Sequence, residues 1–424
     1  MINLVKFFKD NILKLLFIGI LTKGKKEVSI SSAIKTTVWK YYAFNFFKGG
    51  ALFSAVLVPF YTDWGGISLF QIQILQSWFM LWIFIMEVPT GAVADFFGRK
   101  YSIGFGAFLV SVATLVYGSV SNFYIFLLGE FLFAIAVALM SGADDALLYD
   151  SLKEAGKEDE NKKYMGRARS FELGGILVGS IVGSLVITKL PLNYPMLLSS
   201  IPYFIAGFIA LSIKEPKIRA KVSESKRYLV VLKKGFTFFY RHKTLRIMAF
   251  DAVMVSAAAY FVIWFYQPLL KNAGVPMFYF GFFHAFLVTV QIVISSQFEW
   301  LEKRIGGGQK LISFGALVTA TSFILVGIFP ILPFIVLLII LAGGFGLTRM
   351  GLITSYMNKF IPSEERATVL SSISMFRRFA LVIVNPIMGF VADKSLSAAL
   401  LLVAILPLLV FAFSPLEKEM VEEE

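Results

Sequence analysis

The chain has 424 residues, of which 58% are apolar and only 16% are charged. Soluble domains are roughly 45–50% apolar and about 25% charged, so this composition excludes an ordinary soluble multi-domain protein. The absence of cysteine excludes disulfides, thiolate metal sites and cysteine nucleophiles. A net charge of +13 would suggest a nucleic-acid partner in a soluble protein, but in a membrane protein its distribution matters more than its sum.

Long apolar runs recur along the chain at the length that a membrane helix requires. A hydrocarbon core of about 30 Å needs about 20 helical residues per crossing, so twelve crossings would use roughly 240 residues. The sequence therefore predicts an all-α membrane protein with twelve transmembrane helices. Their expected ranges are about 41–62, 70–94, 101–119, 123–148, 168–187, 194–213, 246–270, 277–300, 310–328, 331–357, 368–392 and 397–414.

The basic residues alternate strictly between the two ends of these spans. Of the 40 Lys and Arg residues, the loop-by-loop count assigns 35 to the N-terminal segment, the even-numbered loops and the C-terminus. Three lie in the odd-numbered loops and two inside spans. Because basic residues stay on the cytoplasmic side, we expect both termini in the cytoplasm. The expected location is the cytoplasmic membrane of a prokaryote.

The N-terminal segment 1–40 begins with an apolar stretch of mixed character. Lys9, Asp10 and Lys14 interrupt residues 1–22, and no small-residue cleavage site follows. Val5, Phe8, Ile12, Leu15 and Leu16 share one helical face. An amphipathic helix at the membrane surface is therefore expected here, rather than a signal peptide.

The longest polar stretch divides the spans into two sets of six. Two bundles of equal size joined by a basic linker are typical of parallel halves related by pseudo-symmetry about the membrane normal. The expected division is a six-helix half over 41–213, a cytoplasmic linker over 214–245, a second half over 246–414 and an acidic cytoplasmic tail over 415–424. Within the linker, residues 228–239 predict a further amphipathic helix.

The most specific motif lies between spans 2 and 3. It reads Gly91-Ala-Val-Ala-Asp95-Phe-Phe-Gly98-Arg99-Lys100. A short turn needs Gly98 for its backbone and basic residues for the membrane surface. Asp95 could pair with Arg99 or oppose the positive N-terminus of another helix, and would then act as a latch. The alternative is a charged turn that only fixes the topology.

This motif resembles the signature of the major facilitator superfamily, Gly-x-x-x-Asp-x-x-Gly-Arg-[Arg/Lys], at every specified position. Glu87-Val-Pro-Thr before Gly91 is similar to a prokaryotic, drug-efflux-like subgroup. The resemblance implies a secondary transporter with a cavity between two halves. It also implies that Asp95 and Arg99 belong to a cytoplasmic gate.

Other motifs of the proton antiporters in this superfamily are only partly present. Span 4 carries Glu130 where many antiporters have an Arg. Span 5 reads Gly175-Ile-Leu-Val-Gly179-Ser-Ile-Val-Gly183, which keeps three glycines and lacks the antiporters' Pro. Because small residues at this spacing let helices approach closely, we interpret these glycines as packing residues.

Charged residues inside the spans are the second informative class. Each costs roughly 2.5–3.5 kcal/mol at a helix centre, so such groups normally face protein or water. The resemblance implies that spans 1, 4, 7 and 10 line the cavity. The charges on these spans, our candidates for proton coupling or cavity contacts, are Lys48, Glu130, Asp144, Asp145, Asp251 and Arg349.

Two specific roles are expected among these charges. Asp144 or Asp145 is expected to pair with Arg349 across an inner gate, since both groups approach the cytoplasmic end of repeat-related spans. The alternative is a static pair that only satisfies the two charges. Glu130 lies further out without an obvious base except Lys48, and burial favours a protonated carboxyl. Glu130 is therefore the first candidate for reversible protonation, against the alternative of a snorkelling or purely structural side chain.

Enzymatic and metal-dependent functions find no support in the sequence. It contains no phosphate-binding Gly-Lys-[Ser/Thr] loop and only two histidines, His242 and His284. We expect no enzyme activity, no cofactor and no metal.

The expected function is proton-coupled efflux of an amphipathic or cationic small molecule by a monomer embedded in the lipid bilayer, with no nucleic-acid partner. Two alternatives remain open: a nutrient uniporter or symporter of the same fold, and a receptor or scaffold without transport.

Overall fold

The computed structural model describes residues 32–216, 237, 242–362, 366–416 and 421, and these form helices and connecting turns without a β-strand. Twelve helical segments in the described part are long and apolar enough to cross a membrane, as the sequence predicts. The amphipathic helix expected within residues 1–22 lies outside the described residues, as does the one expected over 228–239 apart from Thr237.

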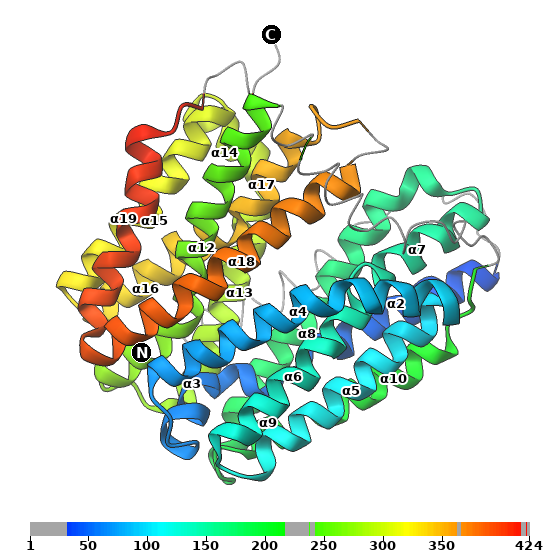
Figure 1. Ribbon diagram of the computed structural model, residues 1–424, viewed down its shortest axis with the longest axis horizontal. Coiled ribbons are helices and arrows are strands. Elements are labelled where there is room, and N and C mark those ends of the chain that lie inside the picture. The colour runs from blue at the N-terminus through cyan, green and yellow to red at the C-terminus, as the bar shows by residue number, and fades with distance from the viewer. Residues whose placement is uncertain (1–31, 217–236, 238–241, 363–365, 417–420, 422–424) are drawn as a thin grey trace.

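The helices up to residue 212 form the N-terminal half (Figure 1). In chain order they are α2 (Ser32–Lys48), η1 (Leu52–Val56), α3 (Leu57–Pro59), η2 (Phe60–Trp64), α4 (Leu69–Phe97), α5 (Arg99–Ser119), α6 (Phe123–Met140), α7 (Ala143–Glu154), η3 (Glu158–Glu160), α8 (Asn161–Val186), α9 (Tyr194–Leu198) and α10 (Ser200–Ser212).

The helices from residue 243 onward form the C-terminal half. They are α12 (Lys243–Asn272), η5 (Met277–Tyr279), α13 (Phe280–Ser296), α14 (Phe298–Ile305), α15 (Gly308–Ile328), α16 (Leu332–Leu341), η6 (Ala342–Gly346), α17 (Leu347–Met357), α18 (Arg366–Lys394) and α19 (Leu396–Phe413).

Helix starts follow local capping chemistry. Ser68 and Gln71 form a reciprocal capping box at the start of α4, which satisfies two backbone donors that have no partner within the helix. The Ser395 hydroxyl caps α19 by accepting from the Ala398 amide. Helix α2 begins at Ser32, before the expected start of span 1 at residue 41, because the helix continues through polar residues beyond the apolar run.

Spans 1, 4 and 10 carry interruptions near their charged residues, which the apolar runs alone did not predict. Span 1 breaks after Lys48 and resumes as the short helices η1, α3 and η2. Span 4 breaks between α6 and α7 at Gly142, whose φ of +71° favours glycine. Span 10 contains the π-helical turn η6 between α16 and α17. Such interruptions in membrane helices are frequent at functional sites.

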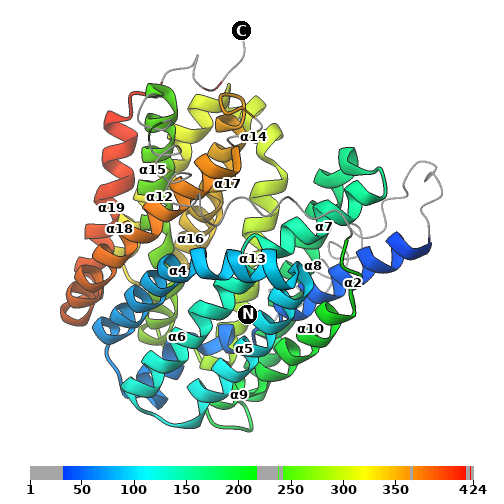
Figure 2. The same ribbon diagram turned by 45° about the vertical axis from the view of Figure 1, so that its right-hand side comes forward.

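We call the end of the bundle with the turns at Gly98 and residues 155–160 the basic end. The end with the turns at Gly65 and residues 120–122 is the far end. The ribbons of the two halves converge toward the far end and diverge toward the basic end (Figures 1 and 2). At the far end, Lys271 pairs with Asp63 across the halves at 2.6 Å.

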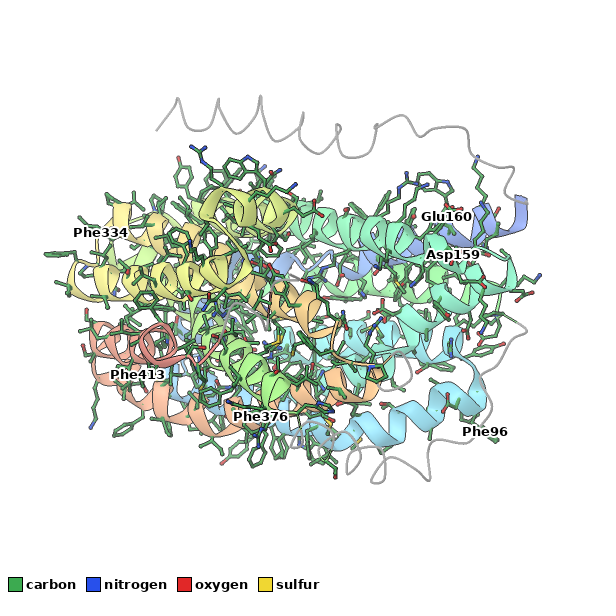
Figure 3. All side chains as sticks on the ribbon, turned by 90° about the horizontal axis from the view of Figure 1, so that it is seen from above. Phe96, Asp159, Glu160, Phe334, Phe376 and Phe413 are labelled. Carbon is green, nitrogen blue, oxygen red and sulfur yellow. The ribbon has the colours of Figure 1, made fainter. Side chains whose placement is uncertain are left out.

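The outside of the bundle is apolar, as contact with lipid requires. Phe96, Phe376 and Phe413 lie on the periphery when the bundle is seen from above, and each is more than half exposed (Figure 3). Asp159 and Glu160 follow α7 at the basic end, where a charged turn can face water.

Candidate functional site

The break in span 1 is held in place by α8. A Cβ atom at Gly175 would lie 2.0 Å from the Phe46 carbonyl oxygen, and one at Gly183 would lie 2.1 Å from that of Leu52. The glycine ridge of span 5 therefore packs directly against the interrupted backbone of span 1, which confirms the interpretation as packing residues. This contact fixes Lys48, the last residue of α2, beside α8.

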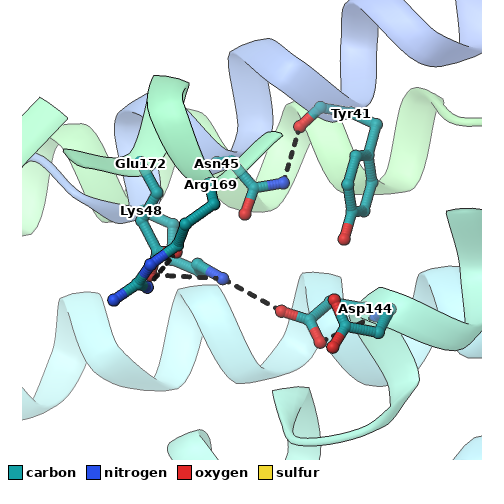
Figure 4. A network of polar contacts seen from close by, with 7 residues as sticks. Tyr41, Asn45, Lys48, Asp144, Arg169 and Glu172 are labelled. Atoms are coloured by element: carbon teal, nitrogen blue, oxygen red, sulfur yellow. Dashed lines mark hydrogen bonds and ion pairs between the residues drawn. The ribbon is translucent and has the colours of Figure 1, made fainter. Parts of the chain in front are cut away.

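Lys48 is the centre of a polar network inside the N-terminal half (Figure 4). Its Nζ atom lies 2.9 Å from Asp144 Oδ2 and 3.6 Å from Glu172 Oε1. Glu172 also pairs with Arg169 at 2.5 Å. The side chains of Lys48, Asp144 and Glu172 are 15–19% exposed, so the network is partly open to solvent. Its third neighbouring acid, Asp145, is exposed.

The position of Asp144 follows from the break in span 4. Asp144 and Asp145 occupy the first turn of α7, where the unpaired backbone amides favour negative charge. The Asp144 carboxylate accepts a hydrogen bond from the Asp145 amide at 2.8 Å while it binds Lys48. The restart of the helix therefore stabilises the acid that neutralises Lys48.

A second ion pair is buried in the C-terminal half. Arg349, just after η6, donates to Asp251 Oδ1 from Nε at 2.9 Å and from Nη2 at 2.5 Å. Its Nη1 donates to the Ile312 carbonyl at 2.6 Å, and the Ser414 hydroxyl donates to the other Asp251 oxygen at 3.3 Å. The two charged side chains are only 2% and 3% exposed.

The predicted pair between Asp144 or Asp145 and Arg349 is therefore wrong in this structure. Asp144 pairs with Lys48 and Arg349 pairs with Asp251, each within its own half. The physical reason is that each break supplies a partner at close range on the neighbouring span. Each pair joins the first and fourth spans of its half. In the N-terminal half the base lies on the first span and the acid on the fourth, and in the C-terminal half the acid lies on the first span and the base on the fourth.

Glu130 lies in a different environment, where neutral groups replace the expected base. Its carboxyl is buried, with 5% of the residue exposed. Its Oε1 atom accepts from Gln76 Nε2 at 2.8 Å and from the Tyr61 hydroxyl at 3.3 Å. Among the described residues no cation pairs with it, because Lys48 binds Asp144. A buried carboxyl held only by neutral donors can exist protonated or ionised, depending on its surroundings.

A chain of hydrogen bonds connects Glu130 to the other half. The Gln76 amide that donates to Glu130 also accepts from the Tyr260 hydroxyl at 3.3 Å. Tyr260 lies on α12 and Gln76 on α4, so the amide bridges the halves. A change at the Glu130 carboxyl can therefore reach the contact between the halves through one side chain.

The motif between spans 2 and 3 forms contacts that differ from the expected ones. Arg99 pairs with Asp150 of α7 and donates to the Ala146 carbonyl at 2.6 Å, rather than binding Asp95. The Glu215 carboxylate accepts from the backbone amides of Arg99 and Lys100 at 2.8 and 3.0 Å. This anion occupies the N-terminus of α5, where backbone donors favour it.

Three further residues of the motif bear on its proposed gate. Asp95 is exposed and makes no hydrogen bond or ion pair with the described residues. Gly91 is exposed as well. Gly98 has a φ of +111° between α4 and α5, so the turn requires a glycine.

Sequence reasoning missed the ion pair between Glu87 and Arg378. Arg378 donates to Glu87 Oε2 at 2.7 Å and so joins α18 to α4 across the halves. The loop-by-loop count assigned Arg378 to the cytoplasmic side, although it lies well inside span 11. The sequence did contain a signal for this pair, because Glu87 and Arg378 are opposite charges inside two different expected spans.

The helix arrangement and the charged network define a twelve-span membrane transporter fold. The family model of the Major Facilitator Superfamily matches residues 41–385, and the chain belongs to this family. It is 22% identical over 397 residues to the uncharacterized MFS-type transporter YxaM of Bacillus subtilis (strain 168), covering 89% of this chain and 96% of that protein.

Solved structures share the fold at low sequence identity. The nucleoside transporter NupG superposes with a TM-score of 0.72 at 15% identity, covering 93% of this chain and 100% of that one. A D-xylose-proton symporter superposes with a TM-score of 0.67 at 11% identity, covering 92% and 99%. The fold and the family, and hence transport as the general function, are confirmed.

Proposed function

We propose that the protein is a proton-coupled secondary transporter in which Glu130 is the proton site. The observation that carries this proposal is the pairing of the other cavity charges. Lys48 neutralises Asp144 and Arg349 neutralises Asp251, whereas the buried Glu130 has no cation partner among the described residues. Because no cation of the described residues fixes its charge, this buried carboxyl can carry a proton in one state of the transport cycle and release it in another, where water or a cationic substrate reaches the resulting carboxylate.

The proposed transport mode is alternating access in the cytoplasmic membrane of a prokaryote. We place the basic end and both termini in the cytoplasm, since 35 basic residues lie toward that side and three toward the other. The contacts between the halves near the far end then correspond to a closed outer side. The proposed transporter acts as a monomer.

The proposed substrate is a cationic or neutral amphipathic molecule that leaves the cell in exchange for protons. A cation and a proton can compete for Glu130, because their electrostatic interaction with a carboxylate is strong in a poorly solvated site. Uptake of a polar nutrient is the second candidate, and the fold shared with a D-xylose-proton symporter favours it. In that case a protonated Glu130 would accompany the substrate.

The direction of the pH gradient distinguishes these functions in proteoliposomes. The membrane potential is clamped with potassium and valinomycin, and the probes are tetraphenylphosphonium, uridine and D-xylose. Accumulation of tetraphenylphosphonium with an acidic interior supports efflux by antiport. Accumulation of uridine or D-xylose with an acidic exterior supports symport. Downhill flux without accumulation under either gradient would contradict proton coupling, and liposomes without protein are the control.

Asp95 is proposed to act as a latch in the state with the outer side open, where it opposes the N-terminus of a helix of the C-terminal half. We expect Asp95→Asn to slow transport about tenfold, since a hydrogen bond to a charged group contributes about 1.5–3 kcal/mol. The protein should fold normally, because Asp95 is exposed in the present state. The measurement is the initial transport rate together with the thermal unfolding midpoint.

Asp159→Asn is the matched control for this variant, since Asp159 is an exposed acid at the same end. An unchanged transport rate in Asp95→Asn would reduce the motif from Gly91 to Lys100 to a topology signal.

A further inference from the structure

Helices α4 and α18 lie side by side and form a seam between the two halves (Figures 1 and 2). The rings of Phe70 and Phe390 are 6.2 Å apart. The Ser77 hydroxyl donates to the Val382 carbonyl at 3.0 Å. Nearer the basic end, Glu87 pairs with Arg378. The residue numbers rise along α4 as they fall along α18, so the two helices are antiparallel.

Gln73 and Asn385 lie level with one another in this seam. On α4, Gln73 lies between Phe70 and Ser77. On α18, Asn385 lies between Phe390, which contacts Phe70, and Val382, which contacts Ser77. Asn385 is one helical turn from Gly389, where a Cβ atom would lie 2.8 Å from Gln73 Cβ. The seam is therefore tightly packed at the level of the two amides.

Both amides are buried without a hydrogen bond to the part of the chain that the structure describes. Gln73 and Asn385 are each 0% exposed, and none of their four side-chain nitrogen and oxygen atoms has a partner among the described residues. An unpaired buried polar group costs free energy, because water satisfies it when it is exposed. An apolar pair of the same shape would fill the seam without this cost.

Unpaired amides are not a general feature of the contact between the halves. Gln267 of α12 accepts from the Val58 amide at 2.8 Å and donates to the carbonyls of Ser54 and Ala55 at 3.1 and 3.2 Å. Gln76 bridges Glu130 and Tyr260. These bonded amides stabilise the closed far end, whereas Gln73 and Asn385 destabilise the same arrangement.

We propose that Gln73 and Asn385 form a polar pair that favours reopening of the far end. When the outer parts of α4 and α18 separate, water reaches both amides and satisfies their donors and acceptors. When the seam closes, these hydrogen bonds are lost. The pair thus opposes the contacts that hold the far end closed, which include the ion pair Lys271–Asp63 and the ring contact between Phe70 and Phe390. The inference requires alternating access but is independent of proton coupling at Glu130.

The test uses the natural absence of cysteine. Ser77→Cys places a reporter within the seam itself, because the Ser77 side chain is buried and faces Val382 of the other half. Intact cells are treated with a membrane-impermeant thiol reagent without added substrate, and Ser121→Cys at the exposed far end gives the reference rate. Adding Gln73→Met with Asn385→Leu should slow labelling of the reporter at least fivefold, because the closed state no longer buries unpaired amides.

Gln267→Leu is the control with the opposite expected sign. It removes hydrogen bonds that hold the far end closed, so labelling of the same reporter should accelerate. The single variants Gln73→Met and Asn385→Leu should each slow labelling partially, which keeps the test decisive if the double variant fails to fold. Unchanged or faster labelling in folded Gln73 and Asn385 variants would overturn the proposal. A raised apparent KM with unchanged labelling would instead make the amides substrate contacts.

Discussion

Glu130→Gln is expected to abolish accumulation of substrate driven by a pH gradient while downhill exchange continues. The amide is isosteric with the carboxyl, and its oxygen can still accept from Gln76 and Tyr61. It cannot release a proton at any relevant pH, so the loss affects coupling rather than architecture. The complete loss of concentrative transport makes this the largest functional effect that we expect.

The measurement is the proton release or uptake that substrate binding causes in purified protein in weakly buffered detergent. The probe is whichever of tetraphenylphosphonium, uridine or D-xylose the parent protein transports. Asp145→Asn is the matched control, because Asp145 is a carboxyl of the same span that is exposed rather than buried. Proton exchange in Glu130→Gln equal to that of the parent would exclude Glu130 as the coupling site. If neither protein exchanges protons, proton coupling itself is wrong.

The membrane spans could be predicted because a single physical requirement controls them. Each needs about 20 apolar residues, and the structure has twelve such helices. The interruptions in spans 1, 4 and 10 were not predicted, because an interruption changes the backbone without lowering the mean hydropathy. Gly142, whose backbone is left-handed, lies in such an apolar run. The sequence does not show that a new helix, α7, begins after Gly142 and so places Asp144 in its first turn.

The candidate charges were found, but their partners were not. Inserting a charge into the membrane is costly wherever it lies, so Lys48, Asp251 and Arg349 are conspicuous in the sequence. Pairing depends on which spans are neighbours and on how far each side chain reaches, and the sequence spacing contains neither. The predicted pair of Asp144 with Arg349 therefore failed, although both residues are in ion pairs.

Neutral polar partners were the hardest to predict. Gln76 and Tyr260 are separated by 184 positions and carry no charge that would mark them inside a span. Their significance comes from the contact between the halves, which brings one amide against both Glu130 and Tyr260. The unpaired state of Gln73 and Asn385 likewise depends on packing and has no counterpart in the sequence.

Asp251→Ala is expected to cause the largest loss of stability among single substitutions of the charged residues. It leaves Arg349 buried without a counter-charge, and breaking a buried pair in this way costs about 3–5 kcal/mol. At roughly 2 °C per kcal/mol for a chain of this size, the thermal unfolding midpoint should fall by about 6–10 °C. Lys48→Met should cost less, because Asp144 and Glu172 are partly exposed and can be hydrated.

The double variant Asp251→Leu with Arg349→Met separates the ion pair from the space that it fills. Replacing both charges with apolar side chains of similar size is often neutral or stabilising, so the unfolding midpoint should return close to that of the parent. If the double variant is as unstable as Asp251→Ala, the hydrogen bonds to Ile312 and Ser414, rather than the charge balance, stabilise this half. A stable double variant that still accumulates substrate would show that the ion pair serves the fold, and would leave Glu130 as the coupling acid. A stable double variant that no longer transports would show that the ion pair takes part in the transport cycle.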